Sequence, residues 1–456
     1  MSAHDAAMRQ PIQATSAFFS NLPDSASLFP STRSKTEFET IVLVSKTKPQ
    51  VILIAYHFPP GPEMGALRPF RFYKYLKRLG FQCHVITASP PDQASPADVS
   101  FIPDELRAVW EGSTKQRLSL RAYQELLVRK LMFPGHIGIM WSIKAASLCH
   151  KIIADHPRDQ FVLFSTYPPL GVLLTGLIVR QRDRIPWIAD FRDPLGIGLG
   201  EAHVSRWMRF WNRRLESTVF RAAGAIIANV EGAAQLWRER YPRAQAKLHV
   251  ICNGFDPEEA PRPRETPPRT QKLIVHAGGL YHGRSPEMVV QSLSRLRAKG
   301  ESEALSAGIL LVGDFDVKVG LTGTLYQQAQ HDGWLELRHA VPRKESLRLL
   351  EEADGLLLIQ PQSDVQVPGK IFEYICIGRP VLAIAPRASA VDWILQNAGP
   401  AHICLHPADD PDTADRKVLE FLRLPVSPVP YSMWFQNNFN AAVQASQLAS
   451  IIENIQ

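Results

Sequence analysis

The stretch Val367–Pro380, VPGKIFEYICIGRP, decides how the rest of the chain is interpreted. It follows an apolar run at residues 355–360, GLLLIQ, which is typical of a strand buried on both faces. A helix is predicted to open at about Pro368, because proline's fixed φ and missing N–H do least harm in a first helical turn. Lys370 and Glu373 then lie one turn apart on the same face of this helix.

The position of Lys370 is unfavourable for the stability of this helix. A cation in the first turn opposes the positive end of the helix dipole, and Lys before Glu is the poorer order for a helical ion pair. Both disadvantages disappear when an anion occupies the helix end, because free N–H groups, the dipole and the ammonium then converge on it. Two interpretations stay open: a surface Lys and Glu, or a phosphate site in which Glu373 accepts hydrogen bonds from a ribose.

Composition indicates an ordinary globular protein of more than one domain. The chain has 456 residues, of which 45% are hydrophobic and 21% are charged, and this length exceeds one hydrophobic core. The net charge of +7 favours anionic partners. We expect no nucleic-acid partner, because nucleic-acid binders concentrate their charge and this chain has no long Lys/Arg block.

Cysteine usage and the first residues favour a cytoplasmic protein. The five cysteines are scattered and form no CxxC pair, so we expect reduced thiols and no metal site. Residues 1–20 lack the apolar region of a signal peptide. Residues 161–179 are the one candidate for a membrane span. Polar residues and Pro168-Pro169 interrupt this stretch, so a buried strand, a turn and a helix fit it better.

The first half of the chain alternates strands with helices. Residues 1–48 are polar and without periodicity, and we expect a disordered extension. A strand at 51–55, a glycine loop, a helix at about 66–79 and a strand at 83–88 form a βαβ unit. The alternation continues to residue 252, with helices predicted at about 115–155 and 205–221. A doubly wound parallel sheet, and hence a Rossmann-like domain at 49–254, follows from this pattern.

The second half repeats the same architecture. Residues 255–270 are dense in proline and charge, which is typical of a linker. Strands and helices alternate again over 271–424, and a tail with a helix at 434–455 occupies 425–456 and can cross back to the N-terminal domain. The α/β pattern describes the GT-B architecture, in which two Rossmann-like domains face each other across a cleft. Ligands bind at the carboxyl ends of such strands, so the active site is expected in the cleft.

Four motifs in this order resemble a known enzyme family. The segments YHFPPGPEMGALRPFRFYKYLKRLGFQCHVIT, PWIADFRDP, VICNGFDP and VPGKIFEYICIGRPVLAI are similar to those of retaining glycosyltransferases of family four, and the similarity runs from about residue 50 to 420. The resemblance implies transfer of a sugar, with retention, from a nucleotide-sugar donor to a glycan or lipid-linked acceptor. It implies no metal and no cofactor, since the nucleotide sugar is a co-substrate. A role in cell-surface polysaccharide biosynthesis is expected.

The resemblance also assigns residues to the donor. Lys370 becomes a candidate for the diphosphate and Glu373 for the ribose hydroxyls. Many members carry another glutamate eight residues before the second, where this chain has Val365, with Asp364 beside it as a weak substitute. Arg284 can neutralise a diphosphate, or it can be a surface charge. Two adjacent glycines allow backbone N–H groups to approach an anion. They are Gly278 and Gly279.

Candidates for the acceptor side lie in the first domain. The loop from Gly61 to Gly65 precedes a helix whose N–H groups can approach the diphosphate or the acceptor, and Arg68 inside that helix is either a ligand or a solvated charge. Asp190, Arg192 and Asp193 end a strand where chemistry is expected; the two carboxylates can position an acceptor hydroxyl, or all three can tie the loop together with ion pairs. His57 contacts the donor sugar or is a satisfied loop histidine.

A basic and aromatic helical segment can contact an anionic membrane at its inner face, or it can be a solvated, partly packed helix. Its residues are Arg206, Arg209, Arg213, Arg214, Arg221, Trp207, Phe210 and Trp211. Two other functions remain open: a nucleotide-sugar epimerase of GT-B fold, and a catalytically silent GT-B partner protein. A dehydrogenase is disfavoured because no GxGxxG follows a predicted strand.

Overall fold

The computed structural model describes residues 48–455 apart from 62–63, 94, 105–136, 196–205, 266–268, 282, 317–320 and 322. Almost all of the predicted extension at 1–48 lies outside the described residues. The predicted helix at 115–155 is described only in its second part, as α4 (Ile139–Asp155).

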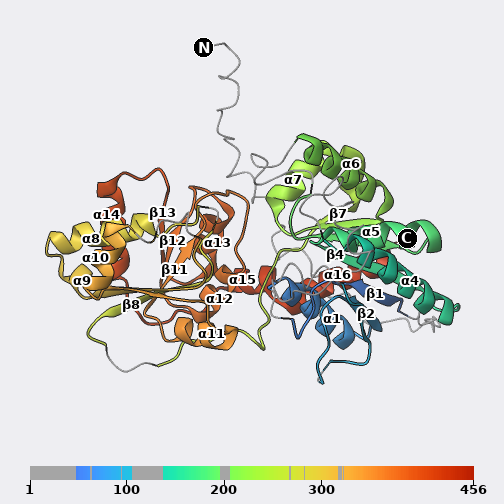
Figure 1. Ribbon diagram of the computed structural model, residues 1–456, viewed down its shortest axis with the longest axis horizontal. Helices are drawn as coiled ribbons and strands as arrows, with labels where there is room; N and C mark the ends of the chain where they lie inside the picture. Colours follow the sequence, from blue (N-terminus) through green and yellow to red (C-terminus); the bar gives the residue numbers. More distant parts are fainter. Residues whose placement is uncertain are drawn as a thin grey trace, which may run out of the picture.

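The first half of the chain forms a seven-stranded sheet in which neighbouring strands pair in parallel (Figure 1). Its strands, in spatial order, are β3 (Val99–Phe101), β2 (Cys83–Thr87), β1 (Gln50–Ile54), β4 (Phe161–Tyr167), β5 (Trp187–Phe191), β6 (Ala225–Ala228) and β7 (Leu248–Val250). Gln50 pairs with Phe161 and Ile54 with Ser165, so β1 and β4 end at the same edge. The continuous apolar run of β1 is buried, as expected of a central parallel strand.

Helices cover both faces of this sheet. One face packs α1 (Leu67–Arg78) and α16 (Ala441–Asn454) through Phe72, Leu76 and Leu448. The other packs α4, α5 (Leu170–Asp183), α6 (Arg206–Ala222) and α7 (Glu231–Arg240), with Trp141, Leu173, Phe220 and Trp237 in its core. The strands are therefore packed between two buried apolar layers. The carboxyl ends of the strands continue into the connecting loops.

The second half forms a six-stranded sheet, again with parallel pairs. Its strands, in spatial order, are β10 (Leu335–Arg338), β9 (Ala307–Val312), β8 (Lys272–Ala277), β11 (Gly355–Ile359), β12 (Val381–Ile384) and β13 (His402–Leu405). One face packs α8 (Glu287–Ala298), α9 (Ser302–Leu305), α10 (Thr324–His331) and α14 (Pro411–Arg423). The other packs α11 (Arg343–Glu351), α12 (Lys370–Ile377), α13 (Ala390–Ala398) and α15 (Met433–Phe439).

The end of the chain returns to the first sheet. The single helix predicted at 434–455 is wrong: α15 packs on the second half, α16 packs on the first, and Asn440 separates them (Figure 1). Asn440 has extended backbone angles, and its side chain accepts a hydrogen bond from the Ala442 N–H, which caps α16. Its backbone bridges to Phe255, which accepts from the Ala441 N–H. Pairing with the linker therefore interrupts the helical pattern.

The apolar stretch at 161–179 forms β4 and the first part of α5, which confirms the strand, turn and helix expected from its polar interruption. None of the described helices combines the length and the apolar character that a membrane span needs. The five cysteines are free thiols. Burial raises the pKa of Cys83 and Cys376 to about 12.

Candidate functional site

Lys370 begins α12 and lies across the turn that follows β8. A Cβ added at Gly278 would lie 1.7 Å from the Lys370 Nζ, and Gly278 has a φ of +150°, so only glycine fits beneath this ammonium. Gly279 continues the turn, with the ring of Tyr281 packed over it. The start of α12, the Lys370 ammonium and the Gly278 turn thus meet at the carboxyl edge of the second sheet.

Further charges surround Lys370. Glu373 does not pair with it; the Glu373 Oε1 instead lies 2.7 Å from the Arg343 Nη2 at the start of α11. Arg284 stacks on the Tyr281 ring, 4.8 Å from its centroid. Burial lowers the pKa of Lys370, Arg284 and Arg343 lower it further, and Glu373 opposes them. Three cations and one carboxylate therefore surround the turn, and an added anion would relieve their mutual repulsion.

His276, the residue before Ala277 at the end of β8, was not predicted from the sequence. It is 4% exposed, and its Nδ1 lies 2.8 Å from the Leu357 carbonyl oxygen, so Nδ1 carries the proton. Burial and then the positive charge of Lys370 lower the pKa of His276 to about 4. The imidazole is therefore neutral at pH 7 and adds no charge below the cation cluster.

His276 should make the protein sensitive to acid. Because its pKa falls from 6.5 to about 4 on folding, the unfolded chain binds the proton first, and stability is lost as pH falls from 6.5 towards 4. The loss should reach about 3 kcal/mol for this group alone. Thermal unfolding at pH 7.0 and 5.0 measures it. His276→Gln should show a smaller drop in melting temperature between the two values, whereas exposed His331→Gln should match the unmodified protein; equal drops in all three would contradict the assignment.

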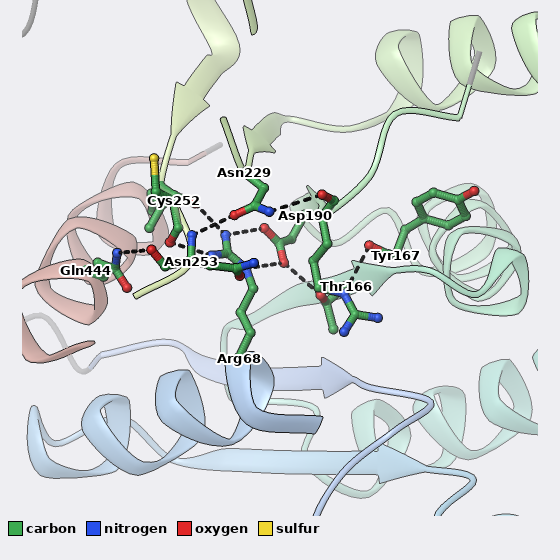
Figure 2. Close-up of polar contacts among 10 residues, drawn as sticks. Arg68, Thr166, Tyr167, Asp190, Asn229, Cys252, Asn253 and Gln444 are labelled. Carbon is green, nitrogen blue, oxygen red and sulfur yellow. Dashed lines mark hydrogen bonds and ion pairs between the residues drawn. The ribbon is translucent and has the colours of Figure 1, made fainter. Parts of the chain in front are cut away.

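The first sheet has a buried ion pair at its carboxyl edge (Figure 2). Asp190 is fully buried, and its two carboxylate oxygens accept from the Arg68 Nε at 3.0 Å and Nη2 at 2.7 Å. Thr166 donates to the same carboxylate at 2.7 Å. Arg68 also donates to the carbonyls of Ile251 and Cys252, each at 2.7 Å. Arg68 is therefore not a solvated charge, and Asp190 is engaged by protein groups.

Arg192 ties the glycine loop to the end of β4. Its guanidinium donates to the carbonyls of Gly65 at 2.6 Å, Tyr167 and Pro168. A Cβ at Gly65 would lie 2.6 Å from the Arg192 Nη1, so glycine is required there for this approach. Asn229 accepts from the Asn253 N–H at 2.6 Å and donates to the Arg192 carbonyl at 3.2 Å (Figure 2). This network joins the loop at Gly65 to Asn253, just before the linker.

The remaining candidates lie around the same edge. Asp193 is exposed, yet neighbouring protein atoms desolvate its carboxyl and raise its pKa, which Arg192 partly opposes. His57 is half-buried and packs edge-on against Tyr56, with ring centroids 5.0 Å apart. The Gly61 N–H donates to the Phe58 carbonyl at 3.1 Å, and residues 62–63 of this loop lie outside the described residues. Asp193 is thus the carboxylate of this group that is open to solvent.

The loop between β11 and α12 faces the first half of the chain. A Cβ added at Gly232, in the first turn of α7, would lie 2.4 Å from the Val365 Cγ1, so the two segments touch. Asp364 beside it is exposed, and its carbonyl accepts from the Ala390 N–H at 2.7 Å. The Lys370 group and the Arg192 loop therefore belong to facing edges of the two sheets. In the described part of the chain, no group of three or more His, Cys, Asp or Glu is placed to hold a metal ion.

Arg343 is the second residue that sequence reasoning missed. It starts a helix thirty residues before Glu373, and no motif connects the two. A basic residue after a proline, Pro342-Arg343, was the available signal, and many surface helices begin in this way.

The sequence and the fold were compared with those of known proteins. Residues 70–259 match the model of Glycosyltransferase Family 4. A comparison with curated proteins gave no match.

Several solved structures share the whole fold. A UDP-forming trehalose-phosphate synthase from Burkholderia xenovorans superposes with a TM-score of 0.57 at 11% identity, over 90% of this chain and 99% of that one. The N-terminal domain of Candida albicans trehalose-6-phosphate phosphatase gives 0.58 at 11%, over 92% and 98%. TarM gives 0.55 at 10%, over 90% and 97%. Residues 70–259 are therefore similar to Glycosyltransferase Family 4, and the two parallel sheets of the chain have the GT-B fold.

Proposed function

We propose that this protein transfers a sugar from a nucleotide-sugar donor to a glycan or lipid-linked acceptor, with retention at the anomeric carbon, in the synthesis of cell-surface polysaccharide. One observation carries the proposal: the Lys370 ammonium lies over the Gly278 turn at the start of α12, with Arg284 and Arg343 close enough to lower its pKa. Such an arrangement suits a diphosphate, whose charges would replace the repulsion among the three cations.

The proposed mechanism is mainly electrostatic. Departure of a nucleoside diphosphate places negative charge on its phosphate oxygens, and preorganised cations stabilise that charge more in the transition state than in the ground state. Glu373 would exchange its contact with Arg343 for the ribose hydroxyls. Asp193, open to solvent on the facing edge, is the carboxylate placed to position an acceptor hydroxyl. No step in this scheme uses a metal or a cofactor.

The proposal is tested first by binding. Nucleoside diphosphates and their sugars are screened by thermal shift, because a ligand at about 100 times its Kd adds about 2.7 kcal/mol to stability. The best donor is then incubated with membrane extracts and lipid-linked acceptors, with and without EDTA, and the anomeric configuration of the product is read by NMR. A retained anomeric product formed in EDTA supports the proposal. An epimer formed from donor alone supports the epimerase, and binding without any turnover supports the silent partner.

The lipid-linked acceptor is supported by α6. The second half of this helix is anchored: Glu216 is buried and accepts from the Leu195 N–H at 3.2 Å and the Tyr241 hydroxyl at 3.0 Å. In the first half, Trp207 and Phe210 are each 55% exposed. Phe210 stands among four arginines that line a hollow of about 430 Å³. They are Arg206, Arg209, Arg213 and Arg214.

The position of this basic face also fits a membrane-bound acceptor. α6 connects the carboxyl end of β5 to the amino end of β6, so its first turns lie at the edge that carries Arg192 and Asp193. Exposed aromatic rings beside arginines suit an interface of anionic headgroups. A lipid-linked acceptor held there would present its sugar towards the cleft.

Replacing Arg209 and Arg213 by glutamine should weaken binding to vesicles containing anionic lipid about 30-fold, at about 1 kcal/mol for each basic residue near the surface. Co-sedimentation at low and high salt measures this, and binding of the unmodified protein should fall as salt rises. The control pair Arg182→Gln and Arg416→Gln removes two exposed arginines elsewhere and should change little. Equal binding to neutral and anionic vesicles would contradict the proposed surface.

A further inference from the structure

The two halves of the molecule touch through a valine and a glycine. Gly232 is buried in the first turn of α7, and Val365 lies in the loop between β11 and α12. A Cβ added at Gly232 would lie 2.4 Å from the Val365 Cγ1 and 3.0 Å from its Cβ. The isopropyl group of Val365 therefore rests directly on the glycine backbone, with no space for another methyl group.

Rigid structure supports Val365. The buried Ser363 hydroxyl accepts from the Val365 N–H at 3.3 Å and from the Gln366 N–H at 2.9 Å, which fixes the turn. The Asp364 carbonyl accepts from the Ala390 N–H at 2.7 Å and so ties the same turn to α13. The backbone of Val365 therefore cannot move away without breaking these hydrogen bonds or moving the second half as a body.

Rigid structure also supports Gly232. The residues that follow it in α7 belong to the core of the first half, where Ala233, Ala234 and Trp237 are buried. The helix begins two residues after Asn229, whose side chain accepts from the Asn253 N–H just before the linker and donates to the Arg192 carbonyl. The position of Gly232 is therefore fixed relative to the acceptor-side loop.

The contact lies between the two half-sites. Val365 precedes Lys370 by five residues, and Gly232 follows the Asn229 support of Arg192 by three. We infer that Val365 and Gly232 are a matched pair of positioning residues that sets the closed separation between the donor and acceptor half-sites. This inference rests on the proposed transferase function. Because reacting atoms must approach within about 3.5 Å, a separation error of about 1 Å is costly for transfer.

The pair is tested by enlarging the side chain at position 232 and then shortening the side chain at position 365. Gly232→Ala forces the halves apart by about 1 Å, since 2.4 Å must become an ordinary carbon contact of about 3.5 Å or more. We expect kcat to fall at least about tenfold while the Kd for nucleoside diphosphate is unchanged. Alanine is a better helix former than glycine, so α7 itself is not weakened. Val365→Ala in the same chain should restore most of the lost kcat.

Two further variants separate positioning from a general effect. Val365→Phe adds bulk from the other side, on a half-exposed loop residue, and should reproduce the loss of Gly232→Ala. Val367→Ala removes the same two methyl groups from the same loop away from the contact, and should not rescue Gly232→Ala. Rescue by both valine variants, or by neither, would overturn the inference.

Hydrogen exchange gives a readout that does not depend on turnover. With nucleoside diphosphate bound, exchange in residues 230–234 and 363–367 should rise in Gly232→Ala and return towards the unmodified level in Gly232→Ala with Val365→Ala. If no donor is turned over, the proposed function fails and exchange alone decides the contact. Unchanged exchange in Gly232→Ala would show that the two residues do not meet in solution.

Discussion

Replacing Lys370 by methionine should lower kcat/KM for sugar transfer about 100- to 1,000-fold, the usual cost of removing one preorganised group that stabilises developing charge. Methionine keeps the length and apolar contacts of the side chain and removes its charge. The ammonium lies over Gly278, is largely withdrawn from solvent, and has Arg284 and Arg343 nearby. A leaving diphosphate gains charge as the sugar departs, and Lys370 is the cation closest to the start of α12.

Initial-rate kinetics with the donor identified by thermal shift measure the effect. Lys344→Met is the matched control, because Lys344 is an exposed lysine in the first turn of α11 beside Arg343. It should keep at least half of the original kcat/KM. The thermal shift produced by nucleoside diphosphate should shrink in Lys370→Met and not in Lys344→Met. A Lys370→Met variant with normal transfer would mean that the anion is held elsewhere.

The surroundings of Lys370 show what a sequence can predict. Lys370 was identified because its place in a helix is electrostatically wrong, and the structure brings it onto the Gly278 turn, nearly one hundred residues earlier in the chain. Both features are local, since a first-turn cation and a pair of glycines can be recognised within a few residues. The partner of Glu373 could not be recognised, because Arg343 reaches it only through the packing of α11 beside α12.

The order of strands and helices could also be predicted from the sequence. Buried parallel strands such as β1 and β11 are continuous apolar runs, and the glycine loops between them have distinct chemistry. The break at Asn440 could not be predicted, because residues 434–455 keep a helical pattern on both sides of it. What interrupts the helix is the bridge to Phe255, a contact between segments far apart in the sequence.

The end of β5 shows what cannot be predicted from a local stretch of sequence. The motif ADFRD places Asp190 in β5 and Arg192 and Asp193 in the loop that follows, so strand alternation does not set the directions of the last two side chains. Asp190 points into the protein and meets Arg68 from α1, whereas Asp193 stays exposed. The sequence of β5 alone does not say which carboxylate has an internal partner, because that depends on how α1 packs over the strand ends.

Asp190→Asn should therefore act on stability, with a loss of about 3–5 kcal/mol in the free energy of unfolding. The substitution leaves the Arg68 guanidinium buried without its countercharge, at a point where it also donates to the carbonyls of Ile251 and Cys252. Those carbonyls belong to the chain just before the linker, so the damage should include the junction between the two halves. Urea unfolding followed by circular dichroism measures the change in midpoint.

A variant of the neighbouring carboxylate, Asp193, distinguishes a structural role from a chemical one. Asp193→Asn removes an exposed charge and should change stability by less than about 0.5 kcal/mol, while any effect on transfer appears in kcat. The double variant Arg68→Met with Asp190→Leu removes both buried charges together and should be more stable than Asp190→Asn, because an unpaired buried ion costs more than an absent pair. If Asp190→Asn instead kept its urea midpoint and lost only turnover, the carboxylate would have to act on the substrate, and its engagement by Arg68 and Thr166 would be a resting arrangement that the acceptor displaces.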